Sequence, residues 1–317
     1  MNLETGNQQP ATISFTITIL GSSGALPAYG RFPSAQLVEI ENRYFLVDCG
    51  EGVQMQLMRY HANMHRIGHI LISHLHGDHY LGLVGLLFSM HLLGRTNDLH
   101  LYSQPGLDEI ITAHLRYSRA APAFRIIFHP LGHETPQTIF EDDKLTVETI
   151  PLTHKLPCTG FLFREKTKPR RIDKTRLPAG LLLQQIAALK KGYDVTDEDG
   201  NILYRNEELT LPPRKSRSYA YCSDTAFAPH IANQIKGVDA LYHEATFGQD
   251  EAERAHLTGH STAAEAATLA SLAGAGKLLI GHFSARYRDL TPLLDEARQI
   301  FPNTDLAEEG KVEELVC

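Results

Sequence analysis

The chain has 317 residues, of which 43% are hydrophobic and 21% are charged, and its formal net charge is −7. These values are typical of a globular protein that buries a substantial core, as one large domain or two small ones. The negative charge argues against nucleic-acid binding over the whole surface, but it is compatible with a local basic patch.

Predicted strands and helices alternate along the chain. Alternating or short apolar runs predict strands at 13–20, 36–40, 43–47, 70–72, 99–102, 145–150, 219–222, 240–242 and 278–280. Helical spacing predicts helices at 53–60, 81–93, 107–117 and 181–191. A capping box, Thr262-Ala263-Ala264-Glu265, predicts the start of a further, Ala-rich helix. Strands mixed with helices in this way indicate an α/β domain built in layers.

No segment of the sequence predicts export or membrane insertion. The start, Met1–Ser14, is polar and lacks the basic and apolar regions of a signal peptide. The longest apolar stretch, 81–93, is interrupted by polar residues and is shorter than the ~20 residues of a membrane span. The four cysteines show no CxxC spacing, so we expect a reduced, cytoplasmic protein without a membrane partner.

The segment His74-Leu75-His76-Gly77-Asp78-His79 carries the strongest chemical signal. It follows a predicted buried strand, so its three imidazoles and one carboxylate should reach a surface site. Imidazole and carboxylate together suit zinc and similar divalent metals. Four donors this close are too many for one tetrahedral ion whose other ligands come from elsewhere. The spacing therefore indicates two ions that share a loop, and with them hydrolytic chemistry.

Residues 155–215 interrupt the regular pattern of the chain. They begin with a run of Lys and Arg between 164 and 176, continue into a predicted helix, and include the acidic turn 197–200. We interpret them as an arm inserted into a catalytic domain formed by residues 1–154 and 216–317. A solvated loop is the alternative, and a charge run alone would favour it.

The order of the polar residues resembles the metallo-β-lactamase superfamily. The hexapeptide is followed by His154, Asp224 and His282, each at the exit of a predicted strand. Four further segments resemble the ribonuclease Z (tRNase Z) family: Val47-Asp48-Cys49-Gly50-Glu51-Gly52, His243-Glu244-Ala245-Thr246-Phe247, Gly259-His260-Ser261-Thr262 and Gly281-His282-Phe283-Ser284-Ala285-Arg286-Tyr287. Together these matches extend over most of the chain.

This resemblance implies a metallo-β-lactamase-type αββα sandwich with a projecting arm and two zinc ions. One ion would be bound by His74, His76 and His154. The other would be bound by Asp78, His79 and His282, and Asp224 would bridge both. Manganese or iron could replace zinc. In the family, Asp78 would also accept a proton from the attacking water.

The resemblance implies that His260 protonates the leaving oxygen. The capping box supports its position, because it places His260 just before a helix N-terminus, where exposed N–H groups favour a phosphate. Glu244 could orient His260 and raise its pKa, although a purely structural hydrogen bond is the alternative. Asp48 is expected to fix the tautomer of a ligand histidine.

The implied activity is a zinc-dependent endoribonuclease that removes the 3′ trailer from precursor tRNA and leaves a 3′-hydroxyl. The family also implies a homodimer in which the arm of one subunit serves the active site of the other. Two alternatives remain at this point. One is another hydrolase with this fold, such as a small phosphodiesterase, a thioesterase or a lactonase. The other is a non-catalytic RNA-binding protein that keeps zinc for stability.

Overall fold

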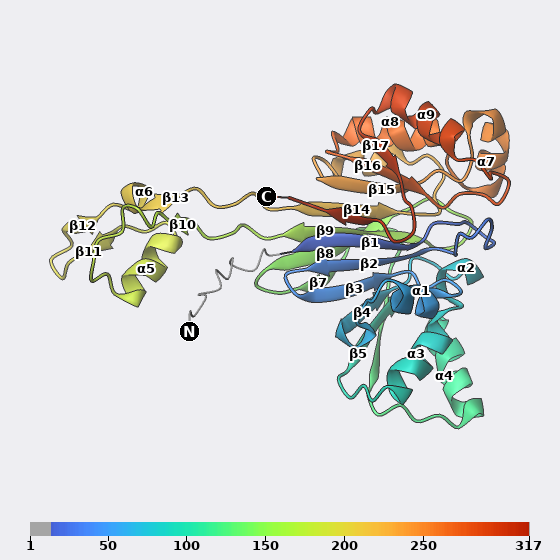
Figure 1. Ribbon diagram of the computed structural model, residues 1–317, viewed down its shortest axis with the longest axis horizontal. Coiled ribbons are helices and arrows are strands. Elements are labelled where there is room, and N and C mark those ends of the chain that lie inside the picture. Colours follow the sequence, from blue (N-terminus) through green and yellow to red (C-terminus); the bar gives the residue numbers. More distant parts are fainter. Residues whose placement is uncertain (1–13, 317) are drawn as a thin grey trace, which may run out of the picture.

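Two seven-stranded sheets pack face to face in the computed structural model, which describes residues 14–316. Helices cover the outer face of each sheet, and a small separate unit projects from one end (Figure 1). This arrangement confirms the predicted αββα sandwich with a projecting arm. The predictions for the first thirteen residues lie outside the described part of the chain.

The first sheet joins an antiparallel half to a parallel half. β1, β2 and β3 pair antiparallel, and β3 to β6 pair parallel. In spatial order its strands are β18 (Val312–Glu314), β1 (Phe15–Gly21), β2 (Ala35–Ile40), β3 (Arg43–Val47), β4 (Ile67–Leu71), β5 (Leu99–Ser103) and β6 (Ile126–Pro130). Its outer face packs against α1 (Val53–Arg59), α3 (Leu83–Leu92) and α4 (Leu107–Ser118).

The second sheet contains the remaining long strands. Its order is β17 (Thr304–Leu306), β16 (Leu278–Gly281), β15 (Ala240–Glu244), β14 (Ser218–Cys222), β9 (Thr159–Glu165), β8 (Leu145–Pro151) and β7 (Thr138–Glu141). The outer face packs against α8 (Ala263–Ala273) and α9 (Thr291–Ile300), and α7 (Ala252–Thr258) precedes α8. Thr262 caps α8 with the predicted capping box. Short 3-10 turns occupy Met64–Arg66, Pro229–Asn233 and Gln249–Glu251.

The core between the sheets is aromatic. Phe45 of the first sheet packs edge-on against Phe163 of the second, with ring centroids 5.4 Å apart. Tyr221 and Tyr242 stack at 4.9 Å, and both are fully buried. Large rings bury much apolar surface per residue, so the contact between Phe45 and Phe163 helps to hold the two sheets together. Tyr221 and Tyr242, in contrast, pack neighbouring strands of the second sheet.

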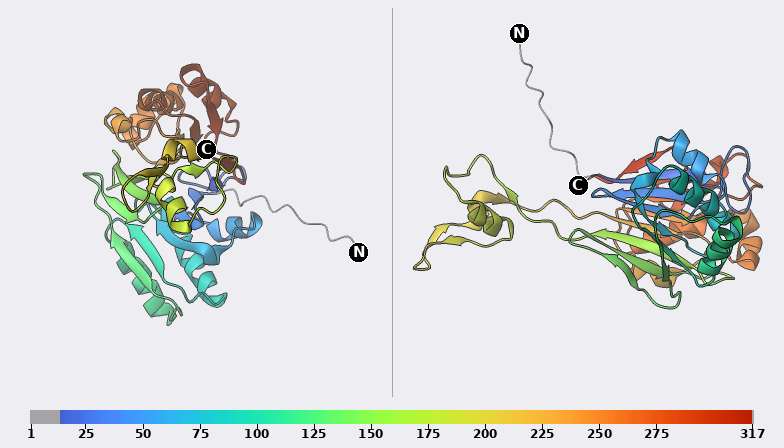
Figure 2. Two further views of the ribbon diagram at one scale, coloured as in Figure 1. Left: turned by 90° about the vertical axis from the view of Figure 1, so that its left-hand side faces the viewer. Right: turned by 90° about the horizontal axis from the view of Figure 1, so that it is seen from below.

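The projecting unit leaves the body between two paired strands, β9 and β14. Its elements are β10 (Arg171–Ile172), α5 (Leu183–Lys190), β11 (Val195–Thr196), β12 (Ile202–Tyr204), α6 (Asn206–Leu209) and β13 (Thr210–Leu211). Leu189, Val195 and Leu209 form a small core of its own. Figure 2 shows the unit on two extended connections, away from both sheets.

Three local features differ from the sequence-based expectations. Residues 159–165, which the sequence analysis groups with the arm, pair with β8 and β14 as a buried strand of the second sheet. Asp78 and His79 lie in a short helix, α2 (Gly77–Tyr80), rather than in a loop. The strands β6, β7, β17 and β18 were not predicted, because they are short and have few fully buried side chains.

Candidate metal centre

The seven predicted ligand residues meet at one edge of the sandwich. They follow β4, β8, β14 and β16, and the last three of these strands run in the same direction in the second sheet. The carboxyl ends of parallel strands lie at the same edge, so loops far apart in sequence converge there. The set consists of His74, His76, Asp78, His79, His154, Asp224 and His282.

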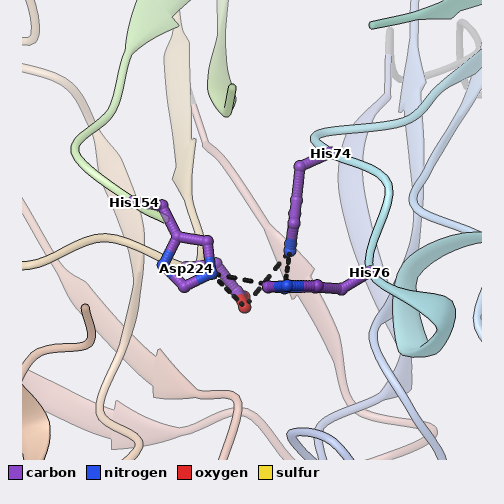
Figure 3. A group of neighbouring side chains, drawn as sticks. All are labelled: His74, His76, His154 and Asp224. Atoms are coloured by element: carbon purple, nitrogen blue, oxygen red, sulfur yellow. Dashed lines mark hydrogen bonds and ion pairs between the residues drawn. The ribbon is translucent and has the colours of Figure 1, made fainter. Parts of the chain in front are cut away.

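The first group of side chains surrounds one oxygen of Asp224. Nε2 of His74 lies 3.4 Å from Asp224 Oδ2, and Nε2 of His154 lies 3.8 Å from the same oxygen. Nδ1 of His76 lies 2.9 Å from Nε2 of His74 and 3.3 Å from Nε2 of His154. Figure 3 shows the three imidazoles, which come from two loops, turned toward the carboxylate.

The second group surrounds the other oxygen of Asp224. Nε2 of His79 and Nε2 of His282 lie 3.1 and 3.0 Å from Asp224 Oδ1. The same two nitrogens lie 3.4 and 3.5 Å from Oδ2 of Asp78. Asp224 therefore offers one oxygen to each group, which is the geometry of a bridging carboxylate.

The donor atoms fit tetrahedral zinc. Two ligands on a tetrahedral ion with bonds of ~2.0–2.1 Å stand about 3.3 Å apart. The separations within the two groups range from 2.9 to 3.8 Å. Nε2 of His79 and of His282 are buried and have no hydrogen-bond partner among the described residues, as expected for atoms that face an ion.

The opposite nitrogens of the ligand histidines are held by the protein. Nδ1 of His154 lies 2.8 Å from the carbonyl oxygen of Gly259, and Nδ1 of His282 lies 2.8 Å from Oγ1 of Thr246. Partners of this kind set the tautomer and direct the free nitrogen at the metal. Thr246 stands in the family-like segment at 243–247, but the sequence gives no sign of this contact.

Asp48 is the centre of a buried hydrogen-bond network behind the ligands. It accepts hydrogen bonds from the backbone N–H of Ser73 (2.8 Å), from the Ser73 hydroxyl (3.0 Å) and from the Tyr221 hydroxyl (2.6 Å). Its Oδ2 lies 2.7 Å from Nδ1 of His79. This is the position predicted for Asp48, and it orients His79.

The electrostatic field at the centre favours a cation. Burial opposes ionisation of Asp224, but the facing imidazoles His282, His79 and His74 hold its pKa well below the usual range. Burial also works against protonation of His79, yet Asp224, Asp48 and Asp78 together raise its pKa well above normal. The same three carboxylates would attract a divalent ion in place of a proton.

Backbone strain is concentrated in this region. Asp48, Asp224 and His282 have φ values of 56°, 57° and 57°, which are uncommon for residues other than glycine. Such residues cost about 1 kcal/mol or more each and cluster at functional sites. The fold accepts this cost at three residues that hold or orient the donor atoms.

His260 and Glu244 stand beside the ligand cluster. Nδ1 of His260 lies 2.9 Å from Oε1 of Glu244, and the His260 ring packs 5.1 Å from the ring of His154. Burial lowers the pKa of His260, but the charge and hydrogen bond of Glu244 outweigh it and raise that pKa to about 9. Glu244 also accepts from the backbone N–H of Thr225 at 2.6 Å and from the Thr246 hydroxyl, so it has a structural role as well.

One contact to the cluster was not foreseen from the sequence. The backbone N–H of Ala25 donates to Oδ2 of Asp78 at 2.7 Å. Ala25 has a φ of 60°, and its loop returns to the first sheet beside the site. The only sequence signal was the flexible Gly-Ser-Ser-Gly stretch at 21–24.

Comparison with known proteins gives close relatives over nearly the whole chain. A "Ribonuclease Z" from Cytophaga hutchinsonii is 51% identical over 298 residues, which are 94% of this chain and 95% of that protein. A "Ribonuclease Z" from Bacteroides fragilis is 45% identical over 301 residues, 93% of this chain and 97% of that protein. A family model described as "Anti-Pycsar protein Apyc1" matches residues 15–168.

Solved structures agree with these sequence relatives. The short form of human tRNase Z is 26% identical, with a TM-score of 0.69, and the match covers 94% of this chain and 98% of that one. The metallo-β-lactamase fold protein YhfI from Bacillus subtilis is 20% identical, with a TM-score of 0.66, and the match covers 95% and 98% of the two chains. The second match shows the fold alone. On the identity and coverage of its relatives, the chain belongs to the ribonuclease Z family.

Proposed function

We propose that this protein is a metal-dependent endoribonuclease that removes the 3′ trailer from precursor tRNA and leaves a 3′-hydroxyl on the tRNA. The observation that carries the proposal is the cluster of five imidazoles and two carboxylates beside His260. It occurs in a chain 51% identical to a protein named Ribonuclease Z.

The cluster is suited to two zinc ions per subunit, with manganese or iron as alternatives. His74, His76 and His154 would hold one ion, Asp78, His79 and His282 would hold the other, and Asp224 would touch both. When bound, two such ions acidify a shared water and stabilise the charged oxygens of a phosphodiester.

Asp78 is the proposed acceptor for the proton of the attacking water. Its carboxylate is held by the N–H of Ala25 and faces the imidazoles of His79 and His282. Those neighbours outweigh the burial that opposes ionisation, so the pKa of Asp78 lies below its usual range. The residue is therefore ionised and placed where a water would be deprotonated.

His260 is the proposed donor of a proton to the leaving 3′-oxygen of the tRNA. Glu244 engages Nδ1, so Nε2 is the ring nitrogen that can reach a substrate. A positively charged imidazole there would also attract the scissile phosphate. Glu244 acts through His260 and is proposed as a positioning residue.

The projecting unit is the proposed tRNA-binding arm, and we assign it residues 166–215. This segment contains eleven Lys and Arg residues against seven Asp and Glu, while the whole chain has a net charge of −7. Six of the eleven basic residues lie at the two ends of the segment, at 166–171 and 214–215, and this local positive charge suits the phosphate backbone of RNA.

A homodimer is part of the proposal. Figure 1 shows the arm at the opposite end of the sandwich from α2, which carries two of the ligand residues. An arm in that position points away from its own metal centre. It would serve the centre of a second copy, as the family resemblance implies.

A cytoplasmic location is also proposed. Cys49, Cys158 and Cys222 are buried free thiols, which suits a reducing compartment. None of the helices within residues 14–316 combines the length and the apolar character that crossing a membrane would require.

The decisive experiment is cleavage of a 3′-extended tRNA transcript by the purified protein with zinc. We expect one cut near the 3′ end of the acceptor stem and a tRNA product that ends in a 3′-hydroxyl. Asp78→Ala should make no cut. Hydrolysis of a chromogenic diester without cleavage of the transcript would indicate a small phosphodiesterase instead. No turnover on either substrate would favour a non-catalytic protein.

A further inference from the structure

A cavity of about 350 Å³ lies beside the metal centre. Five of its lining residues are apolar: Leu75, Pro105, Leu131, Leu156 and Pro157. Gln104 and His133 also line it. The cavity is thus an almost wholly apolar hollow with one amide and one imidazole.

The cavity and the metal centre share two loops. Leu75 stands between His74 and His76, and Leu156 follows His154 by two residues. Neighbouring Cα atoms are 3.8 Å apart along the chain, so the cavity wall begins within one or two residues of the ligands. A substrate that reacts at the centre would therefore have only a short way to extend a group into the cavity.

Gln104 is the unusual member of the lining. It follows β5 and is only 4% exposed. Among the described residues, neither its Nε2 nor its Oε1 has a hydrogen-bond partner. Buried amide atoms are normally paired, because leaving them unpaired costs free energy. Both atoms are themselves buried, so the side chain would have to turn toward the cavity; an occupant with one donor and one acceptor on adjacent atoms would then satisfy both.

This chemistry selects a nucleobase rather than a phosphate or a sugar. The lining has no Lys or Arg to hold a phosphate and only two polar side chains for sugar hydroxyls. A base has two apolar faces, which suit Leu and Pro walls, and an edge with a donor beside an acceptor. Unpaired RNA bases are recognised in this way, and a Gln amide pairs with adenine through two hydrogen bonds.

We propose that the cavity binds the unpaired base of a nucleotide that flanks the scissile phosphate, and that Gln104 reads the edge of that base. The inference rests on the proposed ribonuclease activity and assigns a base-specificity residue to it. The backbone of that nucleotide stays at the metal centre while its base turns into the cavity. Adenine is the base that suits Gln104 best.

The test uses a set of precursor tRNAs that differ only at the two nucleotides on either side of the cut. Each position carries A, G, C, U or an abasic residue, and kcat/KM is measured for the wild type, Gln104→Leu and Gln299→Leu. Gln299 is exposed on α9, outside the cavity lining, and serves as the matched control.

We expect the wild type and Gln299→Leu to lose roughly tenfold or more on the abasic residue at one of the two positions. Gln104→Leu should cleave all four bases at that position at similar, reduced rates. Leu156→Trp, at the partly exposed wall, should slow cleavage of the base-bearing RNA and not of the abasic RNA. This second variant tests the cavity independently of any folding defect in Gln104→Leu.

Two results would overturn the inference while trailer removal stands. One is equal cleavage of abasic and base-bearing RNA by the wild type at both positions. The other is loss of activity in Gln104→Leu on bis(p-nitrophenyl) phosphate, which has no base, because Gln104 would then support the metal centre. Failure of the wild type to cut any of the RNAs would overturn the proposed function and this inference together.

Discussion

At the scale of single residues, Asp48 is the buried carboxylate that holds His79 behind the candidate metal centre. It is fully buried, and the side chains that surround it come from the loop after β4 (Ser73), from α2 (His79) and from β14 (Tyr221). It fixes His79, which faces both Asp78 and Asp224. Its value to the site depends on its being an acceptor on both oxygens.

Replacement of Asp48 by Asn should weaken metal binding. The amide would place a donor against the donors of Ser73, Tyr221 or His79. Loss of such an orienting partner typically lowers metal affinity by ~10–100-fold. Competition with a chelator of known affinity measures the effect. Asp239→Asn is the control, because Asp239 accepts from the N–H and hydroxyl of Ser218 in the same way but lies outside the centre.

Two substrates can distinguish an acid role of His260 from a purely structural role. Removing a general acid typically costs 10²–10⁴ in rate when the leaving group needs a proton. We expect His260→Ala to lose about that factor on precursor tRNA but little on a p-nitrophenyl diester, whose leaving group needs no proton. Glu244→Gln should show the same contrast to a smaller extent.

Metal content is measured alongside for both variants. His256→Ala is the control, since His256 is an exposed histidine on the neighbouring helix α7. Equal losses on the two substrates would contradict the acid role and leave Glu244 and His260 as structural residues.

Among the elements, the arm is the part most nearly independent of the rest. β10 pairs with β13, α5 packs on β10 and β11 through a small apolar core, and Asn206 donates to the carbonyl of Leu189. The arm therefore has to be removed as a whole, because removing only its first half would leave β13 without a partner strand.

The paired positions Arg171 and Leu211 are a suitable place for that deletion. Replacing residues 172–210 by Gly-Gly should close a tight turn between paired strands. The deletion removes five basic residues (Lys174, Arg176, Lys190, Lys191 and Arg205) together with seven acidic ones, so its effect tests specific contacts and not net charge. We expect KM for precursor tRNA to rise at least about tenfold and its salt dependence to become weaker, because those five basic residues would contact phosphates. Hydrolysis of a small diester should be unchanged, and an equal loss on both substrates would exclude a tRNA-binding role.

The inner face of β4, β5 and β6 carries a second group of histidines, which is structural. His69 stacks between Phe45 and His100, and His100 lies 2.9 Å from His129 between their ring nitrogens. Burial, followed by the charges of His100, His129 and Arg95, lowers the pKa of His69 to about 4, and Asp142 opposes this only partly. His69 is thus kept neutral in the folded protein.

The low pKa of His69 leads us to predict that the free energy of unfolding decreases in acid. An unfolded histidine takes up a proton near pH 6.5, and the folded one does so only near pH 4. The stability is complete above pH 6.5 and falls as the pH drops from there to 4, by roughly 3 kcal/mol at most. Urea unfolding at pH 7 and pH 4.5 should show a smaller acid loss for His69→Phe than for the wild type. The same loss in both proteins would contradict this origin.

At the scale of the whole molecule, the candidate metal centre lies where the two sheets meet. His74, His76 and His79 follow β4 of the first sheet, and the remaining imidazoles and Asp224 come from the second. An ion bound by both sheets resists their separation. Its affinity for the folded state then adds directly to the free energy of unfolding.

Chelation should therefore lower the melting temperature reversibly. An ion present at 1,000 times its Kd contributes about 4 kcal/mol. Calorimetry with and without a chelator, followed by return of zinc, measures this contribution. Asp224→Asn should melt at nearly the same temperature in both conditions. If the chelator left the melting temperature of the wild type unchanged, a stabilising ion between the two sheets would be contradicted.

The sequence by itself determined the chemistry and the order of the elements. The ligand types, the strands that deliver them and the capping box before α8 are local patterns of polarity and spacing, so they can be read without the fold. The family resemblance added the roles of the ligands. It also added the αββα order of the layers, which the structure confirms.

Only the tertiary structure decided which atoms meet. Three features depend on loops that follow different strands. They are the separate surroundings of the two Asp224 oxygens, the hydrogen bond from the N–H of Ala25 to Asp78, and the unpaired amide of Gln104. Strand pairing between distant segments sets those contacts, and it leaves no periodic trace in either segment alone. Pairing with a distant strand is also why residues 159–165 belong to the second sheet, although they stand next to the basic run of the arm in the sequence.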